Sequence, residues 1–315
     1  MSVLNHSHYQ PSFFILKGIP GLEDGHIWIS IPCCAFYVCT IVANSLILFI
    51  IKTEAGLHQP MYILLSMLSG SDIALPTCVI PKMLAAFWFN SREIYFEACL
   101  IQMYFTHSFV VVESGVLTVM AFDRYVAICN PLRYTCILTS QLLAKIGLVV
   151  LLRSALLFAP LPFLLKRLTF CPNNVIAHTY CEHMSIAKLA CADIRINSVY
   201  GMTAALTIIA LDFPCIVLSY ALILKAVIGL STKEARVKAF NTCTAHVCVI
   251  VMFYAPIVST VLLQRIAHKT SPTVHIIVAN LYIIVPPAIN PVLYSVNTKE
   301  IRQRVLKIFY HRRAI

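Results

Sequence analysis

Five charged side chains lie inside long apolar stretches of this chain, away from the ends of those stretches, and they are the first candidates for chemistry. They are Asp72, Lys82, Glu113, Arg153 and Asp212. A charge inside an apolar run is costly to bury, so such residues usually face the interior of a helix bundle and mark a functional site. The alternative is a structural polar contact between helices, and for Lys82, Arg153 and Asp212 the two interpretations carry equal weight. The mid-run positions of Asp72 and Glu113 favour a functional site.

A second candidate is the string MAFDRYVAICNPLRY, residues 120–134, which ends an apolar run with the acid–base pair Asp123 and Arg124. Cys99 lies 25 residues before Arg124, which is about 37 Å along a helix. A bilayer with its interfaces measures about 40 Å, so one helix would place Cys99 on the outer side and Arg124 at the inner water boundary. Alternatively, Arg124 only extends its charge to the interface, as basic residues at helix ends often do.

The thirteen cysteines divide by compartment. Most lie within apolar runs, where they pack as small apolar side chains. Four fall on the predicted outer side: Cys99, Cys171, Cys181 and Cys191. An oxidising exterior permits disulfides, and four cysteines allow three connectivities, among which the residues alone do not choose. The competing interpretation is a metal site with the ligands His178, Cys181, Glu182 and His183. Such a site would leave Cys181 unavailable for a disulfide.

Composition indicates a membrane protein. Of the 315 residues, 59% are hydrophobic and 12% charged, with a mean hydropathy of +0.82, whereas a soluble domain has roughly 25% charged residues. Lipid must cover so much apolar surface. The net charge of +11 could suggest nucleic acid, but the charges are distributed as membrane topology requires, so we expect no nucleic-acid partner.

Seven apolar runs are long enough to cross a bilayer as helices. They cover residues 27–51, 61–87, 98–123, 142–165, 198–228, 238–264 and 273–295. The sequence therefore predicts an all-α membrane protein, a seven-transmembrane helix bundle (27–295) in a single domain (1–315). Residues 1–25 are expected to form a short irregular extracellular tail, and Asn5 begins a glycosylation sequon within it.

The basic residues predict the orientation of the bundle. Fourteen lie on the side of the carboxyl terminus and eight on the other, which favours a cytoplasmic carboxyl terminus and an extracellular amino terminus. In the tail 296–315, apolar residues recur on one helical face with basic residues around the rest; they are Ile301, Val305, Ile308 and Phe309. This pattern is typical of a short amphipathic helix on the inner leaflet, so membrane lipids are expected partners.

Further motifs extend along nearly the whole chain: LHQPMY at 57–62, Ser219-Tyr220, KAFNTCTAH at 238–246 and PPAINPVLY at 286–294. Together with residues 120–134 they resemble the signatures of odorant receptors, within the rhodopsin-like G-protein-coupled receptors. GIPGLE at 18–23 and the long outer loop look like the class I (fish-like) odorant receptors. Ala43, Asn241 and Ala245 depart from the usual family residues, and the last two could tune coupling to the G protein.

The resemblance implies two disulfides, Cys99–Cys181 and Cys171–Cys191. It also places Asp72 and Glu113 beside Asn44 and Asn290, in the interior pocket that holds sodium in many rhodopsin-like receptors. Two neighbouring carboxylates do not both ionise readily unless a cation or a proton joins them. The hypothesis is that the pair holds a sodium ion or a shared proton that biases the resting state.

The resemblance further implies a two-state switch that activates a heterotrimeric G protein of the stimulatory olfactory type. Asp123 would restrain Arg124 at rest, and the sixth helix (238–264) would move to expose Arg124. The switch residues that match the family are Asp123, Arg124, Tyr125, Tyr220, Asn290, Pro291 and Tyr294.

A ligand site is expected in the outer half of the bundle. Val258, Val261, Leu262 and Arg265 share one face of the helix expected from the sixth apolar run (238–264), and His107 and Val111 share a face of the third (98–123). In carboxylate-responsive class I receptors, residues matching Arg265 and His107 grip the acid and line the pocket. The implied ligand is a small odorant, with a carboxylic acid as the leading choice. In the alternative, Arg265 sits among lipid headgroups and His107 packs between helices.

Other classes of protein fit less well. The nine glycines form no phosphate-binding cluster, and no HExxH or GxSxG pattern occurs, so we expect neither an enzyme nor a cofactor. Seven unrepeated spans do not suit a transporter built from inverted halves. A receptor of the same fold for a small metabolite, expressed at the plasma membrane of a non-olfactory tissue, remains the alternative function.

Overall fold

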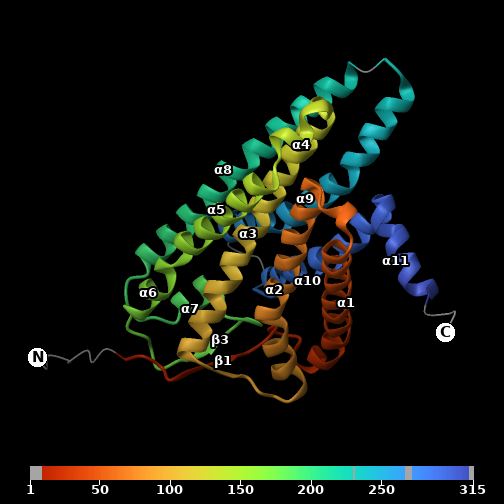
Figure 1. The fold of residues 1–315 in the computed structure, drawn as a ribbon. Helices are drawn as coiled ribbons and strands as arrows, with labels where there is room; N and C mark the ends of the chain where they lie inside the picture. The colour runs from red at the N-terminus through yellow and green to blue at the C-terminus, as the bar shows by residue number, and fades with distance from the viewer. Residues whose placement is uncertain (1–8, 230, 267–271, 312–315) are drawn as a thin grey trace, which may run out of the picture.

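The described part of the chain contains seven helices that are long and apolar enough to cross a membrane, which confirms the predicted bundle (Figure 1). The computed structural model describes residues 9–229, 231–266 and 272–311. The spanning helices are α1 (His26–Thr53), α2 (Pro60–Trp88), α3 (Phe96–Cys129), α5 (Ser140–Phe158) with α6 (Pro160–Lys166), α8 (Arg195–Ile228), α9 (Lys233–Ile266) and α10 (Pro272–Asn297). Short elements lie before and between them: η1 (Glu23–Gly25), η2 (Ala55–Leu57), η3 (Pro131–Arg133), α4 (Tyr134–Ile137) and α7 (His183–Ala187).

Prolines explain where several helices begin or break. Pro60 is the first residue of α2, where its missing N–H leaves no hydrogen bond unmade. Pro76 and Pro81 lie inside an unbroken α2, as a membrane bundle tolerates. The fourth span, expected as one run, divides at Ala159 into α5 and α6. Ala159 keeps helical backbone angles (φ −51°, ψ −37°), and the break coincides with Pro160, whose missing N–H removes one hydrogen bond of the helix.

Helix α3 is the centre of the bundle and packs against α2, α5, α8 and α9 (Figure 1). One apolar cluster, with Leu117 of α3 and Phe253 of α9, fills the half of the bundle near the carboxyl-terminal helix. A second, with Leu100 of α3, fills the half near the strands. Much of the outer surface of the spans is also apolar, as a helix facing lipid requires.

The expectation of an irregular amino-terminal tail is wrong for residues 13–16. Strand β1 (Phe13–Leu16) lies between β2 (Glu93–Tyr95) and β3 (Val175–Ile176), antiparallel to the first and parallel to the second. Phe14 is fully buried against the rings of Phe96 and Phe170. The alternation of buried and half-buried residues that marks a strand is only four residues long here, too short to distinguish from a loop in the sequence.

The amphipathic helix α11 (Lys299–His311) follows α10 and packs back on the bundle. Ile301 is fully buried. Glu300 Oε2 accepts a hydrogen bond from the Tyr62 hydroxyl at 3.4 Å, and Arg304 Nη2 lies 2.9 Å from Glu54 Oε2. These contacts attach the helix to the start of α2 and to the segment between α1 and α2, so α11 marks one end of the bundle.

Candidate functional site

A cavity of about 480 Å³ lies in the half of the bundle that carries the strands. Its walls come from α3, α5, α6, α8, α9 and α10, and the segment around α7 forms its roof. Most of the lining is apolar, with residues such as Val110, Leu161, Ile208 and Ile257. Small-molecule sites have this character, a concave apolar space with a few placed polar groups.

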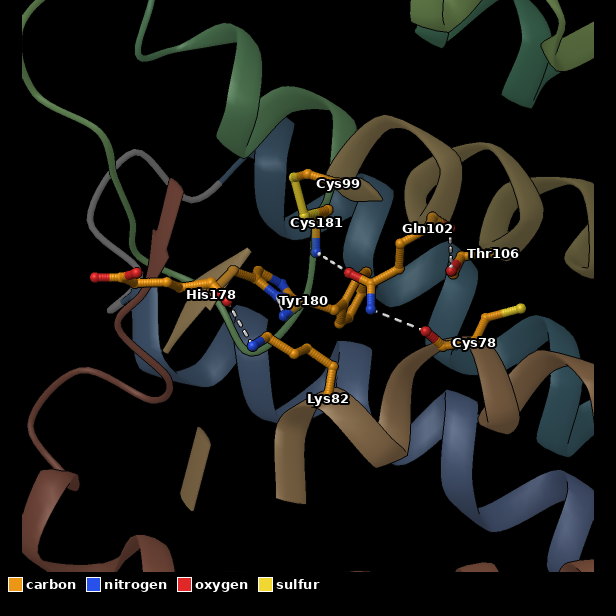
Figure 2. Close-up of a disulfide and its surroundings, with 9 residues drawn as sticks. Cys78, Lys82, Cys99, Gln102, Thr106, His178, Tyr180 and Cys181 are labelled. Atoms are coloured by element: carbon orange, nitrogen blue, oxygen red, sulfur yellow. Dashed lines mark hydrogen bonds between the residues drawn. A yellow bond between two sulfur atoms is a disulfide. The ribbon is translucent and has the colours of Figure 1, made fainter. Parts of the chain in front are cut away.

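Two disulfides hold the roof of the cavity in place. Cys99 of α3 is bonded to Cys181, and Cys171 is bonded to Cys191 within the same loop. Figure 2 shows Gln102 beside the first bond. Its side chain accepts a hydrogen bond from the Cys181 N–H at 2.9 Å and donates to the Cys78 carbonyl of α2 at 2.8 Å. The loop is therefore fixed to α3 covalently and to α2 through one amide.

The amino-terminal tail runs across the same face and adds a second layer to the roof. The N–H of Lys17 donates to the Ile176 carbonyl at 2.9 Å, and the N–H of Gly18 donates to the His178 carbonyl at 3.1 Å. Gly18 has a φ of +87°, and a Cβ there would lie 2.5 Å from the His26 ring, so glycine is required. The ammonium of Lys82 donates to the Ser91 and Glu93 carbonyls at 2.8 and 2.6 Å, which ties α2 to β2. Lys82 thus has the structural role left open by the sequence.

The polar end of the cavity is built from histidines around one carboxylate. Its polar lining includes His107, Glu182, His183, Lys188 and His275. The Nε2 atoms of His107 and His183 are buried and have no hydrogen-bond partner among the described residues. Buried polar atoms without partners are rare in proteins, so these two nitrogens are available to a ligand.

Glu182 caps α7, accepting a hydrogen bond from the Ser185 N–H at 2.6 Å. Burial acts to raise the pKa of this carboxyl, but His178 and the backbone N–H of Met184 outweigh it and lower the pKa to about 2. Burial lowers the pKa of His178 and of His183 to about 4 in each case. The roof therefore presents an ionised carboxylate and two neutral imidazoles at neutral pH.

The structure places only some of the residues of the expected ligand face at the cavity. His107 lines the cavity and stacks on Phe158 with ring centroids 5.3 Å apart. Val111 does not line it, because that side chain is fully buried in the core around Leu100 and Phe158. Val258 is 41% exposed on the outside of the bundle, and its neighbour Ile257 lines the cavity instead. The side chains of Val261, Leu262 and Arg265 lie outside the described part of the structure.

The apolar spacing on α9 could not identify the inward face, because lipid accepts apolar side chains as readily as a core does. Both faces of α9 are apolar, so the period of 3.6 residues marks a helix without fixing its rotation. The sequence reading also missed Ser114, Tyr254, Lys188 and His275, which line the cavity. Ser114 and Tyr254 are polar residues inside apolar runs, and that signal could have identified them.

A buried polar network lies beneath the cavity and joins four helices. The guanidinium of Arg153 (α5) donates to both carboxylate oxygens of Asp212 (α8) at 2.6 and 2.9 Å. The Ser114 hydroxyl of α3 donates to Asp212 at 2.6 Å, and the Tyr254 hydroxyl of α9 lies 2.7 Å from Ser114. Arg153 and Asp212 are thus paired with one another, and two cavity-lining residues connect to them.

The interior carboxylates occupy the middle of the bundle. The Asn290 amide of α10 donates to both oxygens of Asp72 at 3.1 Å, and the Asn44 amide donates to the Pro287 carbonyl at 3.0 Å. Glu113 Oε1, Asn44 Oδ1 and Asn290 Oδ1 are buried acceptors without a partner among the described residues. Hard cations bind oxygen ligands, so these unpartnered oxygens beside a buried acid could hold a small cation. A proton shared between the acids is the alternative.

The metal alternative for the outer loop is not supported. Cys181 is bonded to Cys99, and the described residues contain no group of three or more His, Cys, Asp or Glu side chains able to hold a metal ion. The loop is a disulfide-held roof instead.

The switch residues meet at the α11 end of the bundle. Arg124 Nη2 lies 3.5 Å from Asp123 Oδ2, and the Tyr134 hydroxyl donates to Asp123 Oδ1 at 2.7 Å. Burial and the adjacent Asp123 carboxylate raise the pKa of Tyr134, which keeps the donor protonated. The Tyr220 hydroxyl lies 2.8 Å from His246 Nδ1.

Tyr125 and Tyr294 pack in the apolar cluster of the same region. The Tyr294 hydroxyl is buried and has no hydrogen-bond partner among the described residues. Pro291 is a buried residue within α10, one position after Asn290.

Comparisons with known proteins agree along almost the whole chain. A family model described as olfactory receptor matches residues 33–312. Human olfactory receptor 52P1 is 52% identical over 305 residues, covering 97% of this chain and 95% of its own. Human olfactory receptor 52K2 is 49% identical over 309 residues, covering 98% of each chain. Human olfactory receptor 51F2 is 48% identical over 308 residues, covering 98% of this chain and 90% of its own.

Proposed function

Because this chain belongs to the olfactory receptor family, among the class I receptors, we propose that it detects a small volatile ligand in the cavity beneath the outer loop. It is a multi-pass membrane receptor and not an enzyme. The observation that carries the proposal is an apolar cavity of about 480 Å³ with polar groups gathered at one end. Ligand binding there shifts the equilibrium between the resting and the active receptor. The size of the shift equals the difference between the ligand's binding free energies for the two states.

The proposed ligand class is a carboxylic acid of short to medium chain length. Lys188 supplies a cation at the cavity, and the unpartnered nitrogens of His107 and His183 offer hydrogen bonds. Arg265 is the second proposed anchor, from its place near the outer end of α9. The tail of the acid would lie among the apolar residues of α8 and α9, and each buried methylene adds about 0.8 kcal/mol, roughly fourfold in potency.

Glu182 favours a competing ligand class, the amines. An ionised carboxylate at the cavity repels an acid and attracts an amine. The test is therefore a cyclic-AMP dose–response for an acid, an alcohol and an amine series matched in chain length. Acids more potent than the matched alcohols support the proposal, and amines more potent than both would contradict it.

Two variants separate the anchors. A charge-assisted hydrogen bond contributes about 1.5–3 kcal/mol, so Arg265→Ala and Lys188→Gln should each weaken acids by roughly ten- to a hundredfold if they bind the carboxylate. The matched alcohols should change little. Equal losses for acids and alcohols would make the residue structural. Lys145→Gln, an exposed lysine on α5 away from the cavity, is the control.

The proposed partner is a heterotrimeric G protein of the stimulatory olfactory type, which engages Arg124 after α9 moves. The bond network of Asp123, Arg124 and Tyr134 supports a resting restraint at that end of the bundle. Arg124→Ala should reach the cell surface and lose the cyclic-AMP response. A normal response from that variant would contradict the assignment.

The proposed topology places the amino terminus outside, with Asn5 glycosylated, and α11 in the cytoplasm, within one receptor domain of 1–315. Asn5 lies outside the described residues. The disulfides on the strand-bearing face support this orientation, because disulfides persist in oxidising compartments. Antibody access to epitopes at the two termini of intact cells tests it, together with the gel shift on glycosidase treatment of wild type and Asn5→Gln.

A further inference from the structure

A groove with a volume of about 360 Å³ opens between α8 and α9 near the α11 end of the bundle. Its floor is formed by Ile223, Val227 and Cys243, which are buried against Tyr125 and Ile128 of α3. Its walls include Phe240 and Val247 of α9, which are 52% and 39% exposed. The groove shares no lining residue with the ligand cavity, and the switch residue Tyr220 stands at its edge.

The groove offers nothing to hydrogen-bond. The hydroxyl of Thr244 donates to the Phe240 carbonyl of its own helix at 2.9 Å, and the Tyr220 hydroxyl is paired with His246 at 2.8 Å. All other lining residues are aliphatic, aromatic or cysteine. An occupant must therefore be apolar along this stretch, as an acyl chain is.

Basic residues continue the groove face of α9 toward the end of the helix. Lys233, Arg236, Phe240, Cys243 and Val247 are spaced i, i+3, i+7, i+10 and i+14, so they share one side of the helix. Lys233 and Arg236 are both exposed. This side of α9 thus carries two cations at the start of the helix, followed by the apolar residues of the groove.

The depth of the groove matches a phospholipid. From Lys233 to Phe240 and to Val247 the rise along α9 is about 10 and 21 Å. The headgroup layer of one leaflet is roughly 5–8 Å thick, so the groove lies at the level of the acyl chains when Lys233 is among the headgroups. The inner ends of α8 and α9 project at the end of the bundle away from the strands (Figure 1).

We propose that this groove is a binding site for an anionic phospholipid of the cytoplasmic leaflet, with an acyl chain between α8 and α9 and the headgroup at Lys233 and Arg236. Clustered basic residues at the cytoplasmic ends of helices attract anionic headgroups. The lipid would lie between the inner end of α8 and that of α9, the helix that is proposed to move on activation. The leaflet assignment rests on the proposed orientation.

A peptide of the G protein is the competing occupant. The proposed engagement of a G protein involves Arg124, and Arg124 does not line the groove. No residue of α10 or α11 lines it either, within the described part of the chain. The groove instead opens on the side where Leu224, Phe240 and Val247 face the membrane, which favours lipid.

Photo-crosslinking tests the site. The purified full chain is placed in phosphatidylcholine nanodiscs with a trace of phosphatidylserine that carries a diazirine on its acyl chain, and labelled peptides are mapped. A phosphatidylcholine probe with the same diazirine chain is the matched lipid. We expect the segment 239–248 to be labelled more strongly by the serine lipid. Both faces of a nanodisc present the same lipids, so this result does not depend on the orientation or on any odorant.

Four variants make the result specific. Val247→Trp, which fills the groove, should abolish labelling of 239–248, whereas Val251→Trp, one turn further along the exposed surface, should not. Lys233→Gln should reduce the preference for the serine lipid about fivefold, the equivalent of about 1 kcal/mol. Lys225→Gln, an exposed lysine of α8 outside the lining, should leave it unchanged.

Two outcomes would overturn the proposal. One is labelling spread evenly over the lipid-facing helices that Val247→Trp does not reduce. The other is labelling of 239–248 that is absent, or that is no stronger with the serine lipid than with the choline lipid. Crosslinking of Val247→Cys to an added G protein would then assign the groove to a protein partner.

Discussion

Arg153 of α5 and Asp212 of α8 face each other within the bundle through two parallel hydrogen bonds of 2.6 and 2.9 Å. The Asp212 side chain is 4% exposed and that of Arg153 27%. Removing one partner of a buried pair leaves an uncompensated charge at a cost of about 3–5 kcal/mol. We expect Asp212→Leu and Arg153→Met each to reduce surface expression severely, and the double variant to recover much of it. Surface staining measures this, and a double variant no better than the singles would contradict the pairing.

The outer disulfide should matter more than any cysteine within the spans. Loss of a native disulfide typically costs about 2–5 kcal/mol, comparable to a whole marginal stability. Cys181→Ser frees the roof of the cavity from α3 and should lower both surface expression and response. Cys215→Ser, a free exposed cysteine of α8, is the control and should behave as wild type. Equal expression and response of the two variants would show that the Cys99–Cys181 disulfide does not stabilise the receptor.

The hydroxyl of Tyr134 should restrain the resting receptor. It donates to Asp123 at 2.7 Å, and its loss leaves a buried acceptor short of a partner, at a cost of about 1–3 kcal/mol. We expect Tyr134→Phe to raise cyclic-AMP output without ligand. Cys136→Ser, an exposed residue of the same short helix, should not. Unchanged basal output at equal surface expression would show that the bond does not hold the switch.

The roof of the cavity should lose stability in acid. His178 and His183 have folded-state pKa values of about 4, below the ordinary value of 6.5, because they are buried. The unfolded chain therefore binds protons more tightly, so stability is complete above pH 6.5 and falls between pH 6.5 and 4. At pH 5 the loss is on the order of 1–2 kcal/mol for each histidine. Thermal unfolding of purified receptor should show a smaller pH dependence for His178→Gln than for wild type or His58→Gln.

The interior carboxylates should make the resting state sensitive to sodium. Asp72 is bonded to Asn290, while oxygens of Glu113, Asn44 and Asn290 have no partner among the described residues. If a sodium ion binds there, Glu113→Gln should raise basal cyclic-AMP output and abolish its dependence on sodium. Replacing sodium with choline in the medium is the measurement. A wild-type receptor insensitive to the exchange leaves a shared proton as the explanation, and an unchanged Glu113→Gln variant would eliminate both.

The seven spans, their order and the amphipathic helix could all be predicted from the sequence. A helix that crosses lipid must satisfy its own backbone and needs about 20 apolar residues, so length and composition suffice to find it. The five charged residues within the spans could also be identified as candidates from the sequence, because a charge at that depth is costly and therefore rare. The pairing of Cys99 with Cys181 came from the resemblance to a family, since four cysteines allow three connectivities.

Only the tertiary structure decided which side chains meet. Lipid is as apolar as the bundle core, so hydrophobic spacing could not determine the rotation of α9, and Ile257 rather than Val258 faces the cavity. The partner of Arg153 lies 59 residues away on another helix, a contact that helical spacing cannot reveal. Strand β1 exists because β2 and β3, distant in the chain, supply its hydrogen bonds. A short segment of the tail has no such partners until the bundle brings them together.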